Sequence, residues 1–211
     1  MIPGSAAVFV IDDDALLRAA IQGMLKSVGL RSETFGTTQE FLQSKRPDVP
    51  SCLVLDVRLP GVNGLDFQRQ LADAGVHIPI IFITGHGDIP MSVRAMKKGA
   101  LEFLTKPFRG QELLDAVREG VDRDRGLRSD RAELMEIRAR FDLLTPRETE
   151  ILSEMAQGKS NGAIAKTLGV SERAVEKHSN SIFAKFGLSE EHDLNRRVKA
   201  VLVYLGEAPG S

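Results

Sequence analysis

Three short runs of this chain are apolar at every position, and they constrain its fold more than any other feature. They are residues 8–11, 53–55 and 80–83. A strand with one face in water alternates apolar and polar residues, so continuous apolar runs indicate strands that are buried on both faces. The chain is therefore predicted to contain a sheet covered by helices on each side.

Helical patterns alternate with the strands along the first half of the chain. The segments expected to be strands are residues 8–12, 31–35, 52–56, 80–84 and 101–105. The segments expected to be helices are residues 15–28, 38–44, 64–74 and 91–98, followed by one that begins near Gly110. Strands that alternate with helices form a parallel sheet. Residues 31–35 are the most polar strand, which suits an edge of that sheet.

A smaller, all-helical part follows. The helix that begins near Gly110 runs into a charged stretch at residues 122–131, and we place the end of a first domain at residue 125. Residues 126–142 keep apolar residues at helical spacing and are predicted to be a helical linker. Thr145, Pro146 and Glu148 then have the spacing of a helix start with a capping box. A second domain is expected at residues 143–211.

Composition excludes several classes of protein. Cys52 is the only cysteine, so the chain cannot form an internal disulfide, and the cytoplasm is the expected compartment. Cys52 opens an apolar run and is expected to fill the core. No run approaches the roughly 18 apolar residues of a membrane span, so no membrane association is expected. The formal net charge of -1 gives no indication of a nucleic-acid partner.

Polar residues stand where four of the predicted strands end. The first strand ends in Asp12, Asp13 and Asp14, the third ends in Asp56, the fourth ends in Thr84, and Lys106 follows the fifth. In a parallel sheet these ends meet at one edge, where ligands bind. Each residue alone is more often a helix cap or a solvated side chain, and Asp14 is expected to be a cap. Their coincidence at four strand ends favours a site.

The chemistry of this set points to phosphoryl transfer. Carboxylates that meet at one place repel each other unless a cation joins them, and an all-oxygen set suits Mg²⁺ or Mn²⁺. With a metal beside it, Asp56 can act as a nucleophile and form an aspartyl phosphate. A hydroxyl at Thr84 and an ammonium at Lys106 can hold the remaining phosphoryl oxygens.

These segments resemble the receiver domain of bacterial response regulators over residues 6 to about 125. The resemblance is carried by residues 10–14, 55–64 and 103–108, and residues 83–91 resemble the FixJ subgroup. It implies a doubly wound, flavodoxin-like α/β sheet of strand order 2-1-3-4-5. It also implies that a sensor histidine kinase phosphorylates Asp56. His86, in the FixJ-like segment, is expected to be a loop residue rather than a catalyst.

The same resemblance assigns roles to the residues of the site. It implies that Asp12 and Asp13 hold Mg²⁺ together with Asp56 and the backbone carbonyl of Arg58. It implies that Thr84 and Lys106 bind the phosphoryl group. Phe103 matches the aromatic switch position of the family, which turns inward as Thr84 moves; an ordinary buried aromatic is an equally good interpretation of Phe103 from the sequence.

The second domain has the pattern of a helix-turn-helix. Helices are predicted at residues 146–156, 161–168 and 172–186, with a tight turn at residues 169–171. The domain resembles the LuxR/NarL effector domain through residues 144–148, 158–161, 164–165, 168–171, 175–178 and 185–188. Residues 195–204 resemble the helix that this family uses for dimerisation. The resemblance implies DNA as a partner.

Several side chains are candidates for the DNA contacts. Lys177 and His178 would lie on the recognition helix with Asn180 and Ser181 one turn further, and the candidate phosphate contacts are Lys159, Arg173 and Lys185. Glu176 departs from the family, in which lysine is common. Its carboxylate would weaken binding, accept a hydrogen bond from a cytosine amino group, or pair with Arg173, and pairing is slightly favoured. Basic and acidic residues nearly balance in this domain, so two half-sites are expected to be needed.

The resemblances imply a transcription regulator of a two-component system, active as a phosphorylated homodimer, with no enzymatic activity beyond its own phosphotransfer and autodephosphorylation. One alternative is a regulator whose helical domain binds protein or RNA, because the charge is nearly neutral. A metal-dependent phosphatase or phosphotransferase is a remote alternative. Its nucleophile would end the first strand in an Asp-x-Asp-x-Thr pattern, whereas here Asp14 is followed by Ala15 and Leu16. The sequence leaves open whether the FixJ-like and NarL-like halves combine naturally.

Overall fold

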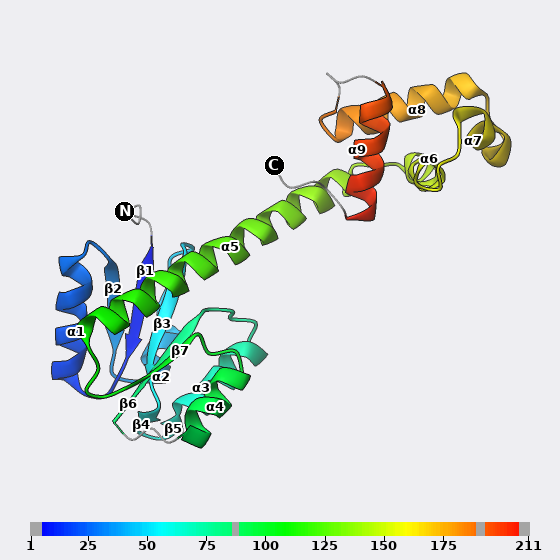
Figure 1. The fold of residues 1–211 in the computed structure, drawn as a ribbon. Coiled ribbons are helices and arrows are strands. Elements are labelled where there is room, and N and C mark those ends of the chain that lie inside the picture. The colour runs from blue at the N-terminus through cyan, green and yellow to red at the C-terminus, as the bar shows by residue number, and fades with distance from the viewer. Residues whose placement is uncertain (1–5, 86–88, 189–192, 207–211) are drawn as a thin grey trace. The chain divides into compact units, whose positions relative to one another are not determined.

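The structure is a computed structural model that describes residues 6–85, 89–188 and 193–206. The chain divides into two compact units, Met1–Asp130 and Arg131–Ser211. His86, which was expected in a loop, lies outside the described residues. Figure 1 labels the helices and strands of both units, which we describe one at a time.

The first unit is built on a five-stranded parallel sheet of order β2-β1-β3-β6-β7. These strands are β1 (Ala7–Ile11), β2 (Arg31–Phe35), β3 (Ser51–Asp56), β6 (Ile80–Thr84) and β7 (Glu102–Thr105). Numbered among themselves, they have the predicted order 2-1-3-4-5, so the predicted fold class is confirmed. The polar strand β2 lies at an edge, as its sequence indicated.

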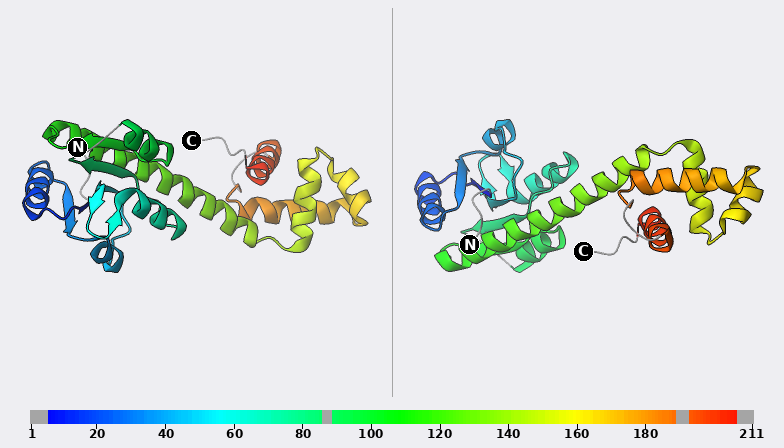
Figure 2. Two further views of the ribbon diagram at one scale, coloured as in Figure 1. Left: turned by 90° about the horizontal axis from the view of Figure 1, so that it is seen from below. Right: turned by 90° about the horizontal axis from the view of Figure 1, so that it is seen from above.

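Helices cover both faces of this sheet (Figures 1 and 2). α1 (Ala15–Ser27) and α5 (Gly110–Asp142) lie on one face, and α2 (Thr38–Gln43), α3 (Gly64–Asp73) and α4 (Ile89–Lys97) lie on the other. Side chains alternate between the two faces along a strand. Val8 and Val10 therefore pack in the cluster with α1 and α5, while Phe9 and Ile11 pack in the cluster with α2 and α3. Burial on both sides explains the continuous apolar runs.

A small hairpin after β3 was not predicted. Its strands are β4 (Arg58–Leu59) and β5 (Val62–Asn63), which pair antiparallel. Gly61 in the turn has a φ of 83°, a left-handed conformation that favours glycine. Strands of two residues are too short to show a period of two in sequence, and this is why the pattern missed them. The hairpin leads into α3, whose N-cap is Asn63.

A buried acid, Asp124, holds α5 to the sheet, although it belongs to the charged stretch at residues 122–131. The side chain of Asp124 is buried and accepts hydrogen bonds from the Ser51 backbone N–H and from Arg128 Nε, each at 2.8 Å. Arg128 also pairs with Asp48. These contacts tie the helix to the beginning of β3. The helix itself continues through residues 126–142, the segment expected to be a helical linker.

The second unit is all-helical, as predicted. It comprises α6 (Pro146–Ala156), α7 (Asn161–Leu168), α8 (Glu172–Lys185) and α9 (Asp193–Leu205). α8 packs against both α6 and α7 (Figure 2). Gly169 ends α7 in the left-handed region and Ser171 caps α8, so a tight turn joins the two helices. Among the side chains that fill the core between the helices are Ile151, Leu152, Ile164, Val175 and Ile182.

Gly120 and Gly126 give a matched test of how closely α5 approaches β3. A Cβ at Gly120 would lie 2.9 Å from Cys52 Cβ, whereas a Cβ at Gly126 would meet nothing within 4 Å. We expect Gly120→Ala to destabilise the first unit by about 1–3 kcal/mol through overpacking. Gly126→Ala should instead stabilise it by about 0.5–1 kcal/mol, because alanine is the better helix former.

The stability of the first unit can be measured through Cys52, since Cys52 is the only thiol in the chain. Its side chain is fully buried, and burial together with the nearby Asp124 raises the thiol pKa to about 12. Labelling of Cys52 by a thiol reagent across a urea titration therefore reports unfolding of the first unit alone. Equal midpoints for the two variants would show that the close packing at Gly120 is unimportant.

Candidate functional site

Three carboxylates gather at the carboxyl edge of the sheet. Asp12 follows β1 and Asp56 ends β3, and these strands are neighbours. One carboxylate oxygen each from Asp12, Asp13 and Asp56 lie within 4.8 Å of one another. Asp12 is fully buried and Asp56 is 6% exposed, while Asp13 is exposed. The cluster therefore has two buried members and one that faces water.

Lys106 joins the two buried carboxylates. Its Nζ donates to Asp12 Oδ2 at 2.6 Å and to Asp56 Oδ2 at 2.7 Å. Burial raises the pKa of Asp12, although the hydrogen bond from Lys106 opposes the rise. Burial alone would lower the pKa of Lys106, but its hydrogen bonds to Asp12 and Asp56 outweigh that effect and raise it. Lys106 is thus a cation whose position depends on both acids.

Backbone groups orient the acids. Asp56 Oδ1 accepts from the Arg58 N–H at 3.0 Å, and Asp12 Oδ1 accepts from the Asp14 N–H at 2.8 Å. Asp14 itself caps α1 by accepting from the backbone N–H groups of Leu16 and Leu17, and this confirms its expected role as a cap. Each acid of the buried pair keeps its second oxygen for Lys106.

Gly64 supports the site in a way that sequence reasoning missed. A Cβ at this position would lie 2.5 Å from the carbonyl oxygen of Asp56 and 3.0 Å from Val57 Cα. Both neighbours are backbone, so they cannot move aside cheaply. Gly64 therefore lets the start of α3 approach the end of the strand that carries Asp56. The only sequence signal was the glycine directly after the Asn63 cap.

The other predicted residues of this site lie on the same strands or next to them. Thr84 is fully buried at the end of β6, and its carbonyl accepts from the Lys106 N–H at 2.7 Å. Phe103 lies on β7, half-buried, with its ring centroid 6.4 Å from that of Phe82. Arg58 begins the β4–β5 hairpin. The structure thus places each of them at or near the edge that carries the cluster.

The donor atoms fit a hard divalent cation. The cluster of Asp12, Asp13 and Asp56 offers oxygen ligands only, which is the set that Mg²⁺ and Mn²⁺ prefer. Asp13, which faces water, leaves a direction from which a hydrated ion can approach. The cluster is therefore compatible with divalent metal binding.

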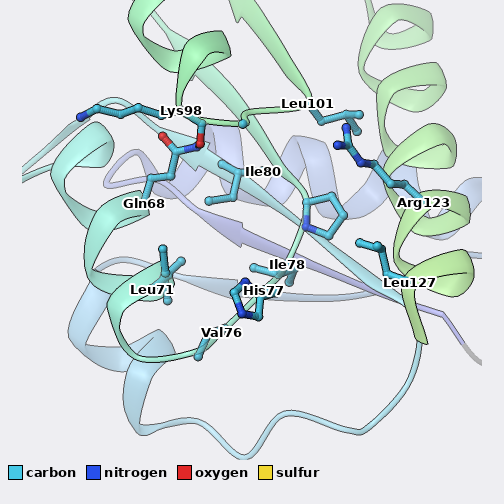
Figure 3. Close-up of a pocket in the computed structure, with 13 residues that line it drawn as sticks. Gln68, Leu71, Val76, His77, Ile78, Ile80, Lys98, Leu101, Arg123 and Leu127 are labelled. Carbon is cyan, nitrogen blue, oxygen red and sulfur yellow. The ribbon is translucent and has the colours of Figure 1, made fainter. Parts of the chain in front are cut away.

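A cavity of about 190 Å³ lies elsewhere in the first unit (Figure 3). Its walls include Gln68 and Leu71 of α3, Ile80 at the start of β6, and Arg123 and Leu127 of α5. Thr84 stands at the other end of β6, and no predicted site residue lines the cavity. The cavity is therefore separate from the acidic cluster.

In the second unit, one face of α8 is exposed. Arg173, Glu176, Lys177 and Asn180 are exposed, and their spacing of three, four and seven residues places them on one side of the helix. The opposite side packs into the core through Val175, Ser179, Ile182 and Phe183. His178 is half-buried at the margin. Four of the predicted DNA-contact residues thus share one accessible face.

The remaining candidates are held by acids of their own unit. Lys185 Nζ donates to Glu148 Oε2 and Ser181 Oγ donates to Glu148 Oε1, each at 2.6 Å. Lys159 Nζ donates to Glu154 at 2.5 Å. These three side chains are committed to internal contacts, which their positions in sequence did not indicate.

Glu148 is the centre of that internal network. Besides its contacts with α8, it closes the predicted capping box by accepting from the Thr145 backbone N–H at 2.7 Å. Burial by itself raises the pKa of Glu148, but hydrogen bonds from Lys185, Ser181 and Thr145 outweigh burial and lower the pKa to about 2. One carboxylate therefore joins the start of α6 to the end of α8.

The prediction that Glu176 forms an ion pair with Arg173 is wrong. Within the described ranges, Glu176 forms no ion pair or hydrogen bond with Arg173 or with any other side chain, although the two residues are one helical turn apart. Exposed pairs of this kind contribute only about 0.3–0.5 kcal/mol, which does not fix two long side chains in one geometry. Both side chains are left facing solvent.

Two family models match the chain. The model of the response regulator receiver domain matches residues 8–118, and the model of bacterial regulatory proteins of the luxR family matches residues 142–198. Among the residues that the structure describes, none of the helices has the length and apolar character needed to cross a membrane.

Curated relatives and solved structures align along almost the whole chain. Nodulation protein W of Bradyrhizobium diazoefficiens is 49% identical over 191 residues, which are 90% of this chain and 84% of that protein. The transcriptional regulatory protein FixJ of Azorhizobium caulinodans is 36% identical and covers 92% of each chain. A low-resolution structure of the response regulator StyR matches with a TM-score of 0.84 and 42% identity, covering 93% of this chain and 98% of that one. Both halves thus occur together in natural relatives, including a FixJ.

The network around Glu148 makes the stability of the second unit sensitive to acid. Because its pKa falls from 4.5 to about 2 on folding, its contribution is fully present above about pH 4.5 and is lost as the pH falls toward 2. We expect Glu148→Gln to destabilise the unit by about 2–3 kcal/mol at pH 7 and by progressively less in acid.

Tyr204 on α9, the only tyrosine of a chain without tryptophan, reports this unit through its fluorescence. Glu150→Gln is the matched control, since its carboxylate lies on α6 in an exposed pair with Arg147. If both variants lost the same stability at pH 7, the buried network would have no special weight.

Proposed function

Since this chain belongs to the response regulators that join a receiver domain to a LuxR-family DNA-binding domain, we propose that phosphorylation of Asp56 is its input. A sensor histidine kinase donates the phosphoryl group. Phosphorylation then controls dimerisation and sequence-specific binding to DNA, and so transcription. The observation that carries the proposal is the contact of Asp56 with Lys106 inside the acidic cluster.

The positions of the side chains support transfer of a phosphoryl group to Asp56. An oxygen of Asp56 attacks the phosphorus of the phosphohistidine, the P–N bond breaks, and the electron pair of that bond stays on the imidazole nitrogen, which takes up a proton. Mg²⁺, held by Asp12, Asp13, Asp56 and the Arg58 carbonyl, would supply positive charge for the phosphoryl oxygens. Lys106 already contacts Asp56, so its ammonium can move from the carboxylate to a phosphoryl oxygen without leaving the site.

Thr84 and Phe103 connect the site to the rest of the receiver. We propose that the Thr84 hydroxyl binds a phosphoryl oxygen and that Phe103 follows it inward. Phe103 is only half-buried, whereas Phe82 beside it is fully buried, so the ring of Phe103 has room to change its exposure. Such a change alters the surface of β7, where a second copy of the receiver can pair.

The chain carries out chemistry only on itself. Asp56 is phosphorylated once and is dephosphorylated by water, and no small-molecule substrate is turned over. DNA and the kinase domain that donates the phosphoryl group are both reached in the cytoplasm, and this is where we propose that the chain acts.

Metal binding should stabilise the receiver. Saturating Mg²⁺, at about 100 times its dissociation constant, is expected to add about 2.7 kcal/mol to the free energy of unfolding. Asp13→Asn should reduce this gain without disturbing the fold, because Asp13 is exposed. Labelling of Cys52 in urea, with and without MgCl₂, measures the gain. Asp14→Asn is the control: it removes a neighbouring carboxylate outside the cluster and retains a good N-cap, so the full Mg²⁺ effect should remain.

Phosphorylation should change DNA binding. Treatment of the full chain with a phosphoryl donor and Mg²⁺ should raise its affinity for a selected operator duplex and shift it toward a dimer, both measured by analytical ultracentrifugation with labelled DNA. The same treatment should change neither the DNA affinity nor the oligomeric state of Asp56→Asn, since its amide is not a nucleophile here. Equal binding by the phosphorylated protein and the Asp56→Asn protein would contradict the proposed switch. Binding that does not weaken as salt rises would point to a partner other than DNA.

A further inference from the structure

We propose that Glu176 reads a cytosine in each half-site of the operator. This inference rests on the proposed function, because it concerns the DNA face of the same regulator. It assigns to one carboxylate the role of choosing a base, in place of the repulsion or internal pairing that its charge otherwise suggests.

Glu176 occupies an exposed position on α8. Glu176 lies in the second turn after the Ser171 cap, and Arg173, Lys177 and Asn180 share its exposed face. The recognition helix of a helix-turn-helix contacts base edges through its N-terminal residues. Glu176 lies between Arg173 and Asn180 on this face. If α8 enters the major groove with this face, Glu176 lies inside the groove.

Other candidate DNA contacts are engaged by acids of their own unit, whereas Glu176 is not engaged. Ser181 and Lys185 turn toward Glu148 and Lys159 turns toward Glu154, so these side chains serve the fold. Glu176 has no ion pair or hydrogen bond among the residues the structure describes. Its carboxylate is thus an acceptor that the protein leaves unused, on the face where a ligand would bind.

The donors and acceptors that each base presents in the major groove decide which base suits a carboxylate. A carboxylate only accepts hydrogen bonds, and the phosphates on both sides of the groove repel it. Guanine presents two acceptors in this groove, thymine an acceptor and a methyl group, and adenine a donor beside an acceptor. Cytosine presents an amino donor alone. It is therefore the base that compensates the charge of Glu176 best.

The inference is tested by selecting bound duplexes from a randomised library, using the full chain phosphorylated in the presence of Mg²⁺. The wild-type chain should retain sequences with a cytosine at one fixed position of each half-site. Glu176→Ala should lose that preference, and Glu176→Gln should shift it toward adenine, whose edge pairs with an amide. At that position, replacing cytosine should weaken wild-type binding about tenfold, within the range of one good base contact.

Glu133→Gln is the matched control. Glu133 is an exposed residue of α5 in the same unit, so the substitution removes the same charge away from α8. It should leave every base preference unchanged. If Glu176→Gln and Glu176→Ala also kept all preferences and only raised affinity uniformly, Glu176 would be a repulsive charge and the inference would be overturned while DNA binding stood. If the wild-type chain selected no sequence, the proposed function itself would fail and the inference with it.

Discussion

The receiver depends on one ammonium placed between two buried carboxylates. Asp12 and Asp56 come from adjacent strands, and burying either charge without a partner would cost several kcal/mol. Lys106, which follows a third strand, supplies the partner for both. The ends of β1, β3 and β7 are consequently linked through a single group. We expect a change in the charge on Asp56 to redistribute the contacts of Lys106, which join all three strand ends.

A second buried acid, Glu148, differs from Asp56 in how completely its oxygens are occupied. Glu148 also pairs with a lysine, but Thr145 and Ser181 occupy its oxygens as well, and its carboxylate has no direction left for a ligand. The acidic cluster around Asp56 keeps an exposed member, Asp13, so one side of the cluster is open to water and compatible with a hydrated divalent ion. A saturated carboxylate holds helices together, whereas an incompletely coordinated cluster is available for chemistry.

Local pattern was enough to predict the sheet and the residues at its edge, because buried parallel strands have apolar runs and their ends are adjacent in space. It was not enough to predict which side chains contact each other. Asp124 lies in a charged stretch, yet it is buried and accepts a hydrogen bond from the Ser51 backbone N–H. Lys185 lies on the recognition helix, yet its ammonium donates to Glu148. The expected pair of Glu176 with Arg173 is absent from the described structure. The pairing of a side chain depends on which groups, distant in the sequence, compete for it. Only the tertiary structure shows which groups these are.

The same competition determines how the effector domain must recognise DNA. With Lys159 and Lys185 engaged by acids of their own unit, the cations left on the exposed face of α8 are Arg173 and Lys177, and Glu176 stands between them. Non-specific affinity grows with the number of phosphates neutralised, so we expect this face to bind arbitrary DNA weakly. Specific affinity must then come from base contacts and from doubling the number of half-sites. Under the proposed function, such a domain would gain most from dimerisation, because a second copy would multiply a contact that is individually weak.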